Sequence, residues 1–412
     1  MARKAPLVDP ESVEIGGRAR MIRGRRGLSL DAAAGLAGIS KPYLWQLENG
    51  KRRFARRGLI EDLAGALSCA VTDLTGQPYL SVDRETADAM AALPGISVAV
   101  NDCTLDDVPD LPARPVEQLV AATAQANAYL DEARFSLAGR GLGALLTELH
   151  VIVATGSTDA RRAALAALAE ACMVATSIAR HLGHADLAVE TARRGYDAAR
   201  RLDDPTRTGL LAMHRALGLT WIGAQHRITA VLDEALTAIT PAADPSAVDT
   251  GPAQAAGMLH LTAALHHAKR ERTGDAEDHL GHANELACCT GECNLLYQHF
   301  GPAHVALWGV EVAVELGRGP ATAERIDTDA ARRLADTLGS ANRRCVLHFD
   351  LARGWAQAEG TRDAEAIRHL DMADRITSQV RNVPVARDLL ADLHDRARRR
   401  VWELDSLLNR FG

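Results

Sequence analysis

The chain lacks the features that mark secreted and membrane proteins. Its seven cysteines stand at irregular positions without a CxxC pair, a pattern that suits reduced thiols better than a disulfide framework. The first twelve residues contain no apolar stretch, and charged residues interrupt the longest apolar runs. We therefore expect neither a signal peptide nor a membrane span, and a cytoplasmic location.

Catalytic motifs are missing as well. The sequence contains no P-loop, GxSxG or HExxH pattern, and the glycine-rich run at Gly139 does not follow a strand pattern. Strand-like alternation of apolar and polar residues is absent from the long C-terminal part. We expect an all-α protein that is not an enzyme and needs no cofactor.

The histidine and cysteine content raises the question of whether the chain binds a metal ion. Seven of the fifteen histidines fall between His260 and His304, with Cys288, Cys289 and Cys293 among them. Structural zinc sites usually contain cysteine pairs at short spacing, and this cysteine group is interrupted by a glycine. Buried thiols and surface histidines are the expected alternative, so we predict no bound metal.

Charge is divided unevenly along the chain. Residues 1–80 carry a net charge of +5, whereas the rest carries −11. A positive surface is what a protein needs to hold a polyanion such as nucleic acid. We therefore expect any nucleic-acid contact to lie within residues 1–80.

The stretch from Gly27 to Arg53 is the most informative. Ser29 and Ser40 are N-cap residues, each followed by a short helical pattern, and Gly38 lies between the two patterns. A second helix would begin after Ser40 and end at Gly50. This pattern is typical of a helix-turn-helix whose second helix enters a DNA major groove. The alternative is an ordinary helical hairpin with a basic rim.

The region from Glu14 to Leu74 resembles a known DNA-binding family. IGGRARMIRGRRGLSLDAAAGLAGISKPYLWQLENGKRR, followed by LIEDLAGALSCAVTDL, is similar to the five-helix, lambda-repressor-like domain of the XRE (Cro/C1-type) family. The resemblance implies that Arg23 and Glu48 form a pair that ties the first helix to the third. Leu30 departs from the family, which often has glutamine there.

The resemblance also implies which residues contact DNA. Three positions usually face base edges, namely Lys41, Pro42 and Gln46. Five others stand where phosphate contacts are usual, namely Ser40, Tyr43, Lys51, Arg52 and Arg53. Side-chain chemistry agrees, since glutamine bridges adenine N6 and N7, lysine donates to guanine, and serine, tyrosine and arginine suit phosphate oxygens.

Residues 81–115 differ in composition from both neighbours. They contain seven acidic residues, four prolines and two arginines. We expect an acidic linker with one short helix near residues 84–93, separating a DNA-binding domain over residues 1–80 from a second domain over residues 116–412.

From residue 116 onward the pattern is helical and repeats. Alanine and leucine recur at three- and four-residue spacing, and turns are marked by glycine near Gly183, Gly274 and Gly360. Successive helical pairs are expected to begin near 163, 206, 253, 301 and 341. The pattern resembles a degenerate tetratricopeptide (TPR) array, an α-solenoid of stacked hairpins with a concave groove.

The C-terminal residues are expected to close this array. A single long amphipathic helix over Val385–Phe411 would cap the last hairpin with an apolar stripe. Within the array, Tyr297, His299, His304 and Trp308 are candidates for a ligand-binding groove. Aromatic residues and histidines at this spacing also suit the repeat core, which is the alternative.

An XRE-type head, an acidic linker and a TPR-like array together resemble a group of bacterial transcription regulators. The resemblance implies a homodimer on double-stranded DNA, at a near-palindromic operator, with an array that receives a small molecule or peptide. The alternative is a TPR-type interaction protein whose helix-turn-helix no longer reads DNA.

Overall fold

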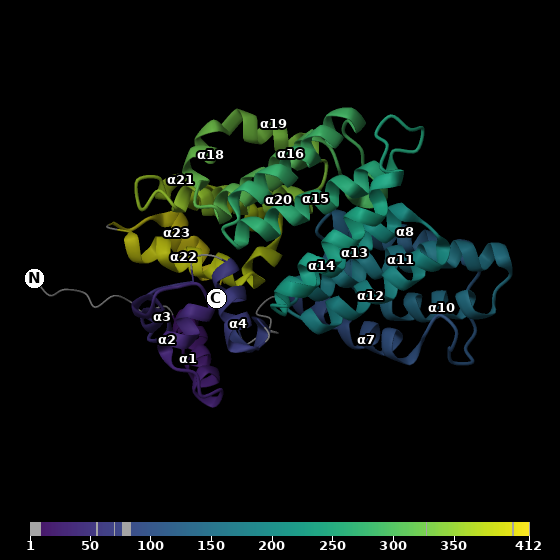
Figure 1. Ribbon diagram of the computed structural model, residues 1–412, viewed down its shortest axis with the longest axis horizontal. Coiled ribbons are helices and arrows are strands. Elements are labelled where there is room, and N and C mark those ends of the chain that lie inside the picture. The colour runs from purple at the N-terminus through teal and green to yellow at the C-terminus, as the bar shows by residue number, and fades with distance from the viewer. Residues whose placement is uncertain are drawn as a thin grey trace, which may run out of the picture.

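The structure is a computed structural model that describes residues 10–54, 57–69, 71–75, 84–326, 328–397 and 399–411. All regular structure in these residues is helical (Figure 1). An N-terminal helix-turn-helix head is followed by a repeat-like region of packed helix pairs. The all-α fold class predicted from the sequence is therefore confirmed.

The head contains the five expected helices. They are α1 (Pro10–Arg25), α2 (Leu30–Leu36), α3 (Lys41–Glu48), α4 (Arg57–Leu67) and α5 (Val71–Thr75). Ile15, Leu44, Leu47, Phe54 and Leu63 are fully buried in its core. The two α3 leucines are three positions apart, which turns one side of this short helix inward and leaves the other free.

The array begins with α6 (Arg84–Met90) and ends with α23 (Trp402–Phe411). Its first half comprises α7 (Leu93–Asp102), α8 (Val116–Asp131), α9 (Phe135–Gly139), α10 (Leu142–Thr155), α11 (Thr158–His181), α12 (Ala185–Leu202), α13 (Pro205–Trp221) and α14 (Gln225–Ile239). Its second half comprises α15 (Gly251–Lys269), α16 (Thr273–Thr290), α17 (Pro302–Glu315), α18 (Gly319–Arg325), α19 (Thr328–Leu338), α20 (Ala341–Ala356), α21 (Asp363–Ile376) and α22 (Pro384–Arg396). Three short 3₁₀ helices are η1 (Thr240–Ala242), η2 (Leu295–Tyr297) and η3 (Ser378–Asn382).

The predicted repeat spacing matches the helices. The expected pairs correspond to α11/α12, α13/α14, α15/α16, α17/α18 and α20/α21, and the first helix of each pair begins within five residues of its predicted position. α19 is an additional helix that the repeat pattern did not predict. Each first helix packs against the next along the array, which forms one continuous core.

Four of the hairpins share one turn. The residue two positions after the first helix has a positive φ, and these residues are Gly183, Gly223, Glu271 and Gly317. The next amide then donates to a carbonyl five residues back, as from His184 N to Ala179 O at 2.8 Å. This is the Schellman arrangement of a helix C-terminus. The turn expected at Gly274 was misplaced, because Glu271 takes the left-handed position and Gly274 lies inside α16.

The acidic segment differs from the expected linker with one helix. Residues 81–83 lie outside the described residues, but the following residues form two helices, α6 and α7, both packed into the array. Gly95 of α7 meets Gly143 of α10 so closely that a Cβ at Gly143 would lie 2.4 Å from the carbonyl carbon of Gly95. The second helix forms here because apolar residues such as Ile96 and Val100 recur at helical spacing and are buried in the array.

The array bends far enough for its two ends to touch. The Thr86 hydroxyl of α6 accepts hydrogen bonds from Gln379 Nε2 at 3.4 Å and Asn382 Nδ2 at 3.2 Å. Ser340, which caps α20, donates to the carbonyl of Asp131 at the end of α8. These contacts join α6 and α8, near the start of the array, to η3 and the N-terminus of α20.

The C-terminal helix is broken, contrary to the single helix predicted over Val385–Phe411. α22 ends at Arg396, Ala397 has an extended conformation, and the chain resumes as α23. The break lets α23 fold back on α21 and α22, where Phe411 is buried and Arg410 pairs with Asp371 and Asp374. A straight helix would carry the second half of the apolar stripe past the last hairpin into solvent.

Among the residues that the structure describes, two stretches are apolar and long enough to span a membrane by composition alone. They are Phe135–Thr155 and Thr158–His181, with 50% and 78% of their most apolar windows buried inside the structure. Both belong to the core of the array, where Leu146, Leu168 and Val174 are fully buried. A helix that is apolar on all sides is typical of the centre of a large helical array.

Candidate nucleic-acid interface

The turn between α2 and α3 forms as the sequence predicts. The Ser29 hydroxyl accepts from Ala32 N at 3.1 Å, and the Ser40 hydroxyl accepts from Tyr43 N at 3.3 Å. Between them, Gly38 has a φ of +66°. These caps satisfy amides that the first helical turn leaves without partners, and they fix where each helix begins.

The outer face of α3 carries the predicted base-reading residues. Lys41 and Pro42 are exposed at its N-terminal end, and Gln46 is half-buried one turn later. Lys41 Nζ lies 4.0 Å from the Asp31 carboxylate of α2, in an ion pair whose two side chains are mostly exposed. This places an amide and an ammonium group on the surface that a major groove would meet.

The predicted phosphate-contacting residues surround this face. Lys51 and Arg52 are exposed just after α3, and each lies over an aromatic ring of the helix. The Lys51 ammonium is 4.3 Å from the Trp45 ring centroid, and the Arg52 guanidinium is 5.4 Å from that of Tyr43. These contacts orient two long cations beside the reading helix.

The predicted pair of Arg23 and Glu48 holds the head together. Arg23 donates from Nε and Nη2 to the two Glu48 oxygens at 2.6 and 2.9 Å, and it also donates to the Leu28 carbonyl at 2.9 Å. The hydrogen bond to Glu48 raises the pKa of Arg23. The pair joins α1 to the end of α3 and so fixes the angle at which the reading helix is presented.

Leu30, the departure from the family pattern, packs inward. Its side chain is half-buried against the head core rather than directed at solvent. Trp45 remains 44% exposed and contacts Lys51. Leu30 therefore contributes to packing, and Trp45 helps to position the Lys51 ammonium group.

Arg53 differs from the other candidate phosphate contacts. Its Nη2 donates to Asp395 Oδ2 of α22 at 2.7 Å, and only 14% of its side chain is exposed. Nearby, the Ser12 hydroxyl of α1 donates to Asp388 Oδ1, also on α22, at 3.1 Å. Two polar contacts thus attach the head to the C-terminal end of the array.

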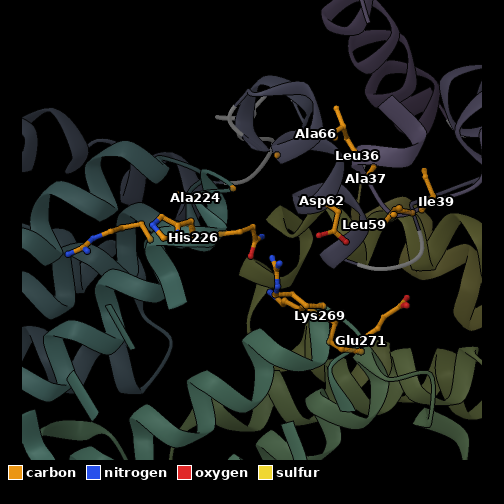
Figure 2. A pocket seen from close by; sticks show the side chains of 17 residues that line it. Leu36, Ala37, Ile39, Leu59, Asp62, Ala66, Ala224, His226, Lys269 and Glu271 are labelled. Atoms are coloured by element: carbon orange, nitrogen blue, oxygen red, sulfur yellow. The ribbon is translucent and has the colours of Figure 1, made fainter. Parts of the chain in front are cut away.

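The middle of the array also touches the head. Ala185 and Trp221 belong to the same hydrophobic cluster as the head core. Beside this contact lies an open cleft of about 700 Å³. Figure 2 shows Leu36, Ile39 and Asp62 of the head facing His226 and Lys269 of the array across it.

The candidate ligand residues lie at the interior of the array, in two environments. Tyr297 and Trp308 line a small cavity. His304 is fully buried and accepts a hydrogen bond from Trp308 Nε1 at 2.9 Å. His299 donates to both oxygens of Asp131 at 2.8 and 2.9 Å, which places Asp131 at the cavity wall.

The histidine-rich stretch forms a cluster between α15 and α16. His260 Nδ1 lies 2.9 Å from His279 Nδ1, and the His267 and His279 rings stack at 5.3 Å. Within the described residues, no group of three or more histidine, cysteine or acidic side chains has a geometry that would hold a metal ion. Cys288 and Cys289 are exposed free thiols.

Comparison with known proteins finds a match for the head alone. A family described as "Helix-turn-helix domain" matches residues 14–74, which are the residues of the helices and turns described above. No curated protein matches the chain. The match and the capped turn together indicate that the chain is a DNA-binding regulator.

Proposed function

We propose that this chain is a sequence-specific transcription regulator of the XRE type, with no enzymatic activity, that acts in the cytoplasm as a homodimer. The observation that carries the proposal is the reading face of α3. It presents Lys41, Pro42 and Gln46 outward, is oriented by the Arg23–Glu48 pair, and is flanked by Lys51 and Arg52.

The division of charge supports the same proposal. The positive residues 1–80 suit a DNA backbone, whereas the remaining chain has a net charge of −11 and would be repelled by it. DNA would then be held by the head alone, and two heads would be needed to cover a near-palindromic operator.

The array would act as the TPR-like sensor and dimerisation domain. Because the head contacts both α22 and the α13–α14 turn, a change in the curvature of the array would shift the head or release Arg53. A small molecule or peptide that alters the array would in this way change operator affinity.

Selection from a random duplex library by the full-length protein tests this proposal. We expect enrichment of a near-palindromic motif with half-sites separated by about one helical turn or a multiple of it. Footprinting then measures how many half-sites one complex covers. Enrichment of DNA without a shared motif would favour the interaction protein with a non-reading head, and a single protected half-site would contradict the homodimer.

A further inference from the structure

The reading helix α3 carries one large aromatic side chain that is largely open to solvent. Trp45 is 44% exposed, and it is not among the buried or half-buried side chains of the head's hydrophobic cluster. Tyr43, the other aromatic residue of α3, does pack against that cluster. A single exposed apolar residue is common on protein surfaces, so the position of Trp45 on the helix decides what it can contact.

Helix geometry places Trp45 on the face that carries the predicted base-reading residues. It lies four positions after Lys41 and three after Pro42, and Gln46 follows it directly. Residues three and four apart on a helix are neighbours on one face. The opposite side of α3 is the buried one, with Leu44, Leu47 and Glu48. A major groove that receives Lys41 and Gln46 would therefore also meet the indole ring.

Two contacts hold Trp45 in this place. The Lys51 ammonium lies 4.3 Å from the centroid of its ring, a cation–π contact. Asn49 Nδ2 donates to the Trp45 carbonyl at 2.7 Å, which fixes the backbone near the C-terminal end of α3. A side chain that is already oriented loses less conformational freedom when it binds. The exposed part of the indole is thus a prepared surface.

The major groove offers such a surface one apolar group. The base edges there present hydrogen-bond donors and acceptors, which suit Lys41 and Gln46, and thymine adds its C5 methyl group. An indole has one N–H donor, and the rest of its ring is apolar carbon. In the major groove the thymine methyl is therefore the group that best matches the exposed ring.

We propose that Trp45 determines part of the sequence specificity by packing against the C5 methyl group of a thymine in each half-site. The inference rests on the proposed function, because it requires α3 to enter a major groove. It adds a base to the operator. Since Trp45 and Gln46 are adjacent and base pairs are stacked about 3.4 Å apart, we expect this thymine within about two base pairs of the position that Gln46 reads.

Removing the methyl group alone tests the proposal. In duplexes of the selected operator, each thymine is replaced in turn by uracil, which keeps every hydrogen-bonding group of the base pair. Fluorescence anisotropy with the full-length protein measures the affinity for each duplex at fixed salt. We expect one uracil in a half-site to weaken binding about fourfold, the loss typical of one buried methyl group. Uracil outside the half-sites should have no effect.

Variants of the protein assign this methyl effect to the indole. Trp45→Ala should bind the thymine and uracil operators equally, and Trp45→Phe should keep part of the preference. Lys51→Ala should weaken both operators alike and keep their ratio, which separates the methyl contact from the placement of the cation. Trp402→Ala, at a 74% exposed tryptophan of α23, should change neither affinity. Trp45→Ala should keep the wild-type Tm, because its side chain lies outside the head core.

Three results would overturn the proposal. The first is equal affinity for every uracil-substituted operator, and the second is an unchanged methyl preference in Trp45→Ala. The third is an equal loss for Trp45→Ala on operator and random DNA, which would mean that the indole contacts the DNA backbone. In all three cases a selected motif would still support the proposed function. Selection without any shared motif would instead contradict sequence reading by α3, and the role of Trp45 with it.

Discussion

Arg53 of the head and Asp395 of α22 form an ion pair at 2.7 Å. The sequence predicts Arg53 as a phosphate contact, yet the pair directs its guanidinium at the protein's own carboxylate. Its Nη1 is buried without a hydrogen-bond partner among the described residues. The arrangement links DNA binding to the contact between head and array, because Arg53 cannot serve both partners at once.

Breaking this pair should strengthen DNA binding. Asp395→Asn removes the competing charge and frees Arg53 for phosphate, so we expect operator affinity to rise by up to about fivefold, as is typical of one partly exposed ion pair. Fluorescence anisotropy with operator DNA measures the change. Asp405→Asn, which breaks the Arg400–Asp405 pair elsewhere in the C-terminal part, is the matched control. Equal affinity in all three proteins would show that the pair does not restrain the head.

Alanine substitutions of Gln46 and Lys51 should weaken DNA binding in different ways. Gln46→Ala should cost about 1–3 kcal/mol on the operator and relax one base position, because glutamine reads a base edge. Lys51→Ala should weaken binding to all sequences alike and lower the slope of log affinity against log salt by about one. Titrations of operator and random DNA at several salt concentrations separate the two effects. An equal loss on both DNAs for Gln46→Ala would remove it from the base-reading set.

The crossing of α7 and α10 should be intolerant of any side chain at Gly143. Gly143→Ala places a Cβ 2.4 Å from the Gly95 carbonyl carbon, and we expect a loss of about 1–3 kcal/mol in the free energy of unfolding. Gly281→Ala, in the middle of α16 with no atom within 4 Å of the added Cβ, should instead stabilise by up to about 1 kcal/mol. Urea unfolding of both variants measures the contrast. Two similar values would mean that α7 is not packed as described.

Acid should destabilise the array through its buried histidines, and His150 is the clearest case. Its Nδ1 donates to the Leu146 carbonyl at 2.7 Å and its Nε2 accepts from Arg194 at 3.0 Å, which requires a neutral ring. Burial, with Arg194 nearby, lowers its pKa to about 4. Between the two pKa values the unfolded chain binds a proton that the folded chain does not. The contribution of His150 to the free energy of unfolding is therefore fully present above about pH 6.5 and is lost as the pH falls toward 4.

Replacing this histidine isolates its share of the acid effect. His150→Gln keeps an acceptor for Arg194 but cannot titrate. The free energy of unfolding should fall with acid less steeply than in the wild type, by up to about 1.4 kcal/mol per pH unit. Urea unfolding at pH 7.5 and pH 5 measures both slopes, with the exposed His226→Gln as control. Parallel slopes in wild type and His150→Gln would contradict the neutral ring.

The head could be predicted closely because its signals are local. Ser29, Gly38 and Ser40 fix helix ends within a few residues of chain, and the structure shows the expected caps. The spacing of the array's first helices could also be predicted, since each hairpin repeats the same turn chemistry. Glu271 is where this prediction of turns from glycine positions was wrong, because Glu271 adopts a positive φ, a conformation that is usually taken by glycine.

What the sequence did not predict depends on contacts between distant parts of the chain. The hydrogen bonds of Thr86 and Ser340 join residues more than two hundred positions apart, and no local pattern indicates them. The break after Arg396 is likewise set by where α23 can bury Phe411. Among the candidate ligand residues, Tyr297 and Trp308 line the small cavity, and His299 and His304 are not among its lining residues.

The most direct test of the account is sequencing of genomic DNA fragments captured by the full-length protein, beside a Lys41→Ala, Gln46→Ala double variant. The account predicts sharp peaks that share a near-palindromic motif with the wild type and lose that motif with the variant. The variant should keep the wild-type Tm, because both side chains lie on the outer face of α3. Enrichment that is the same for both proteins would contradict sequence reading by α3.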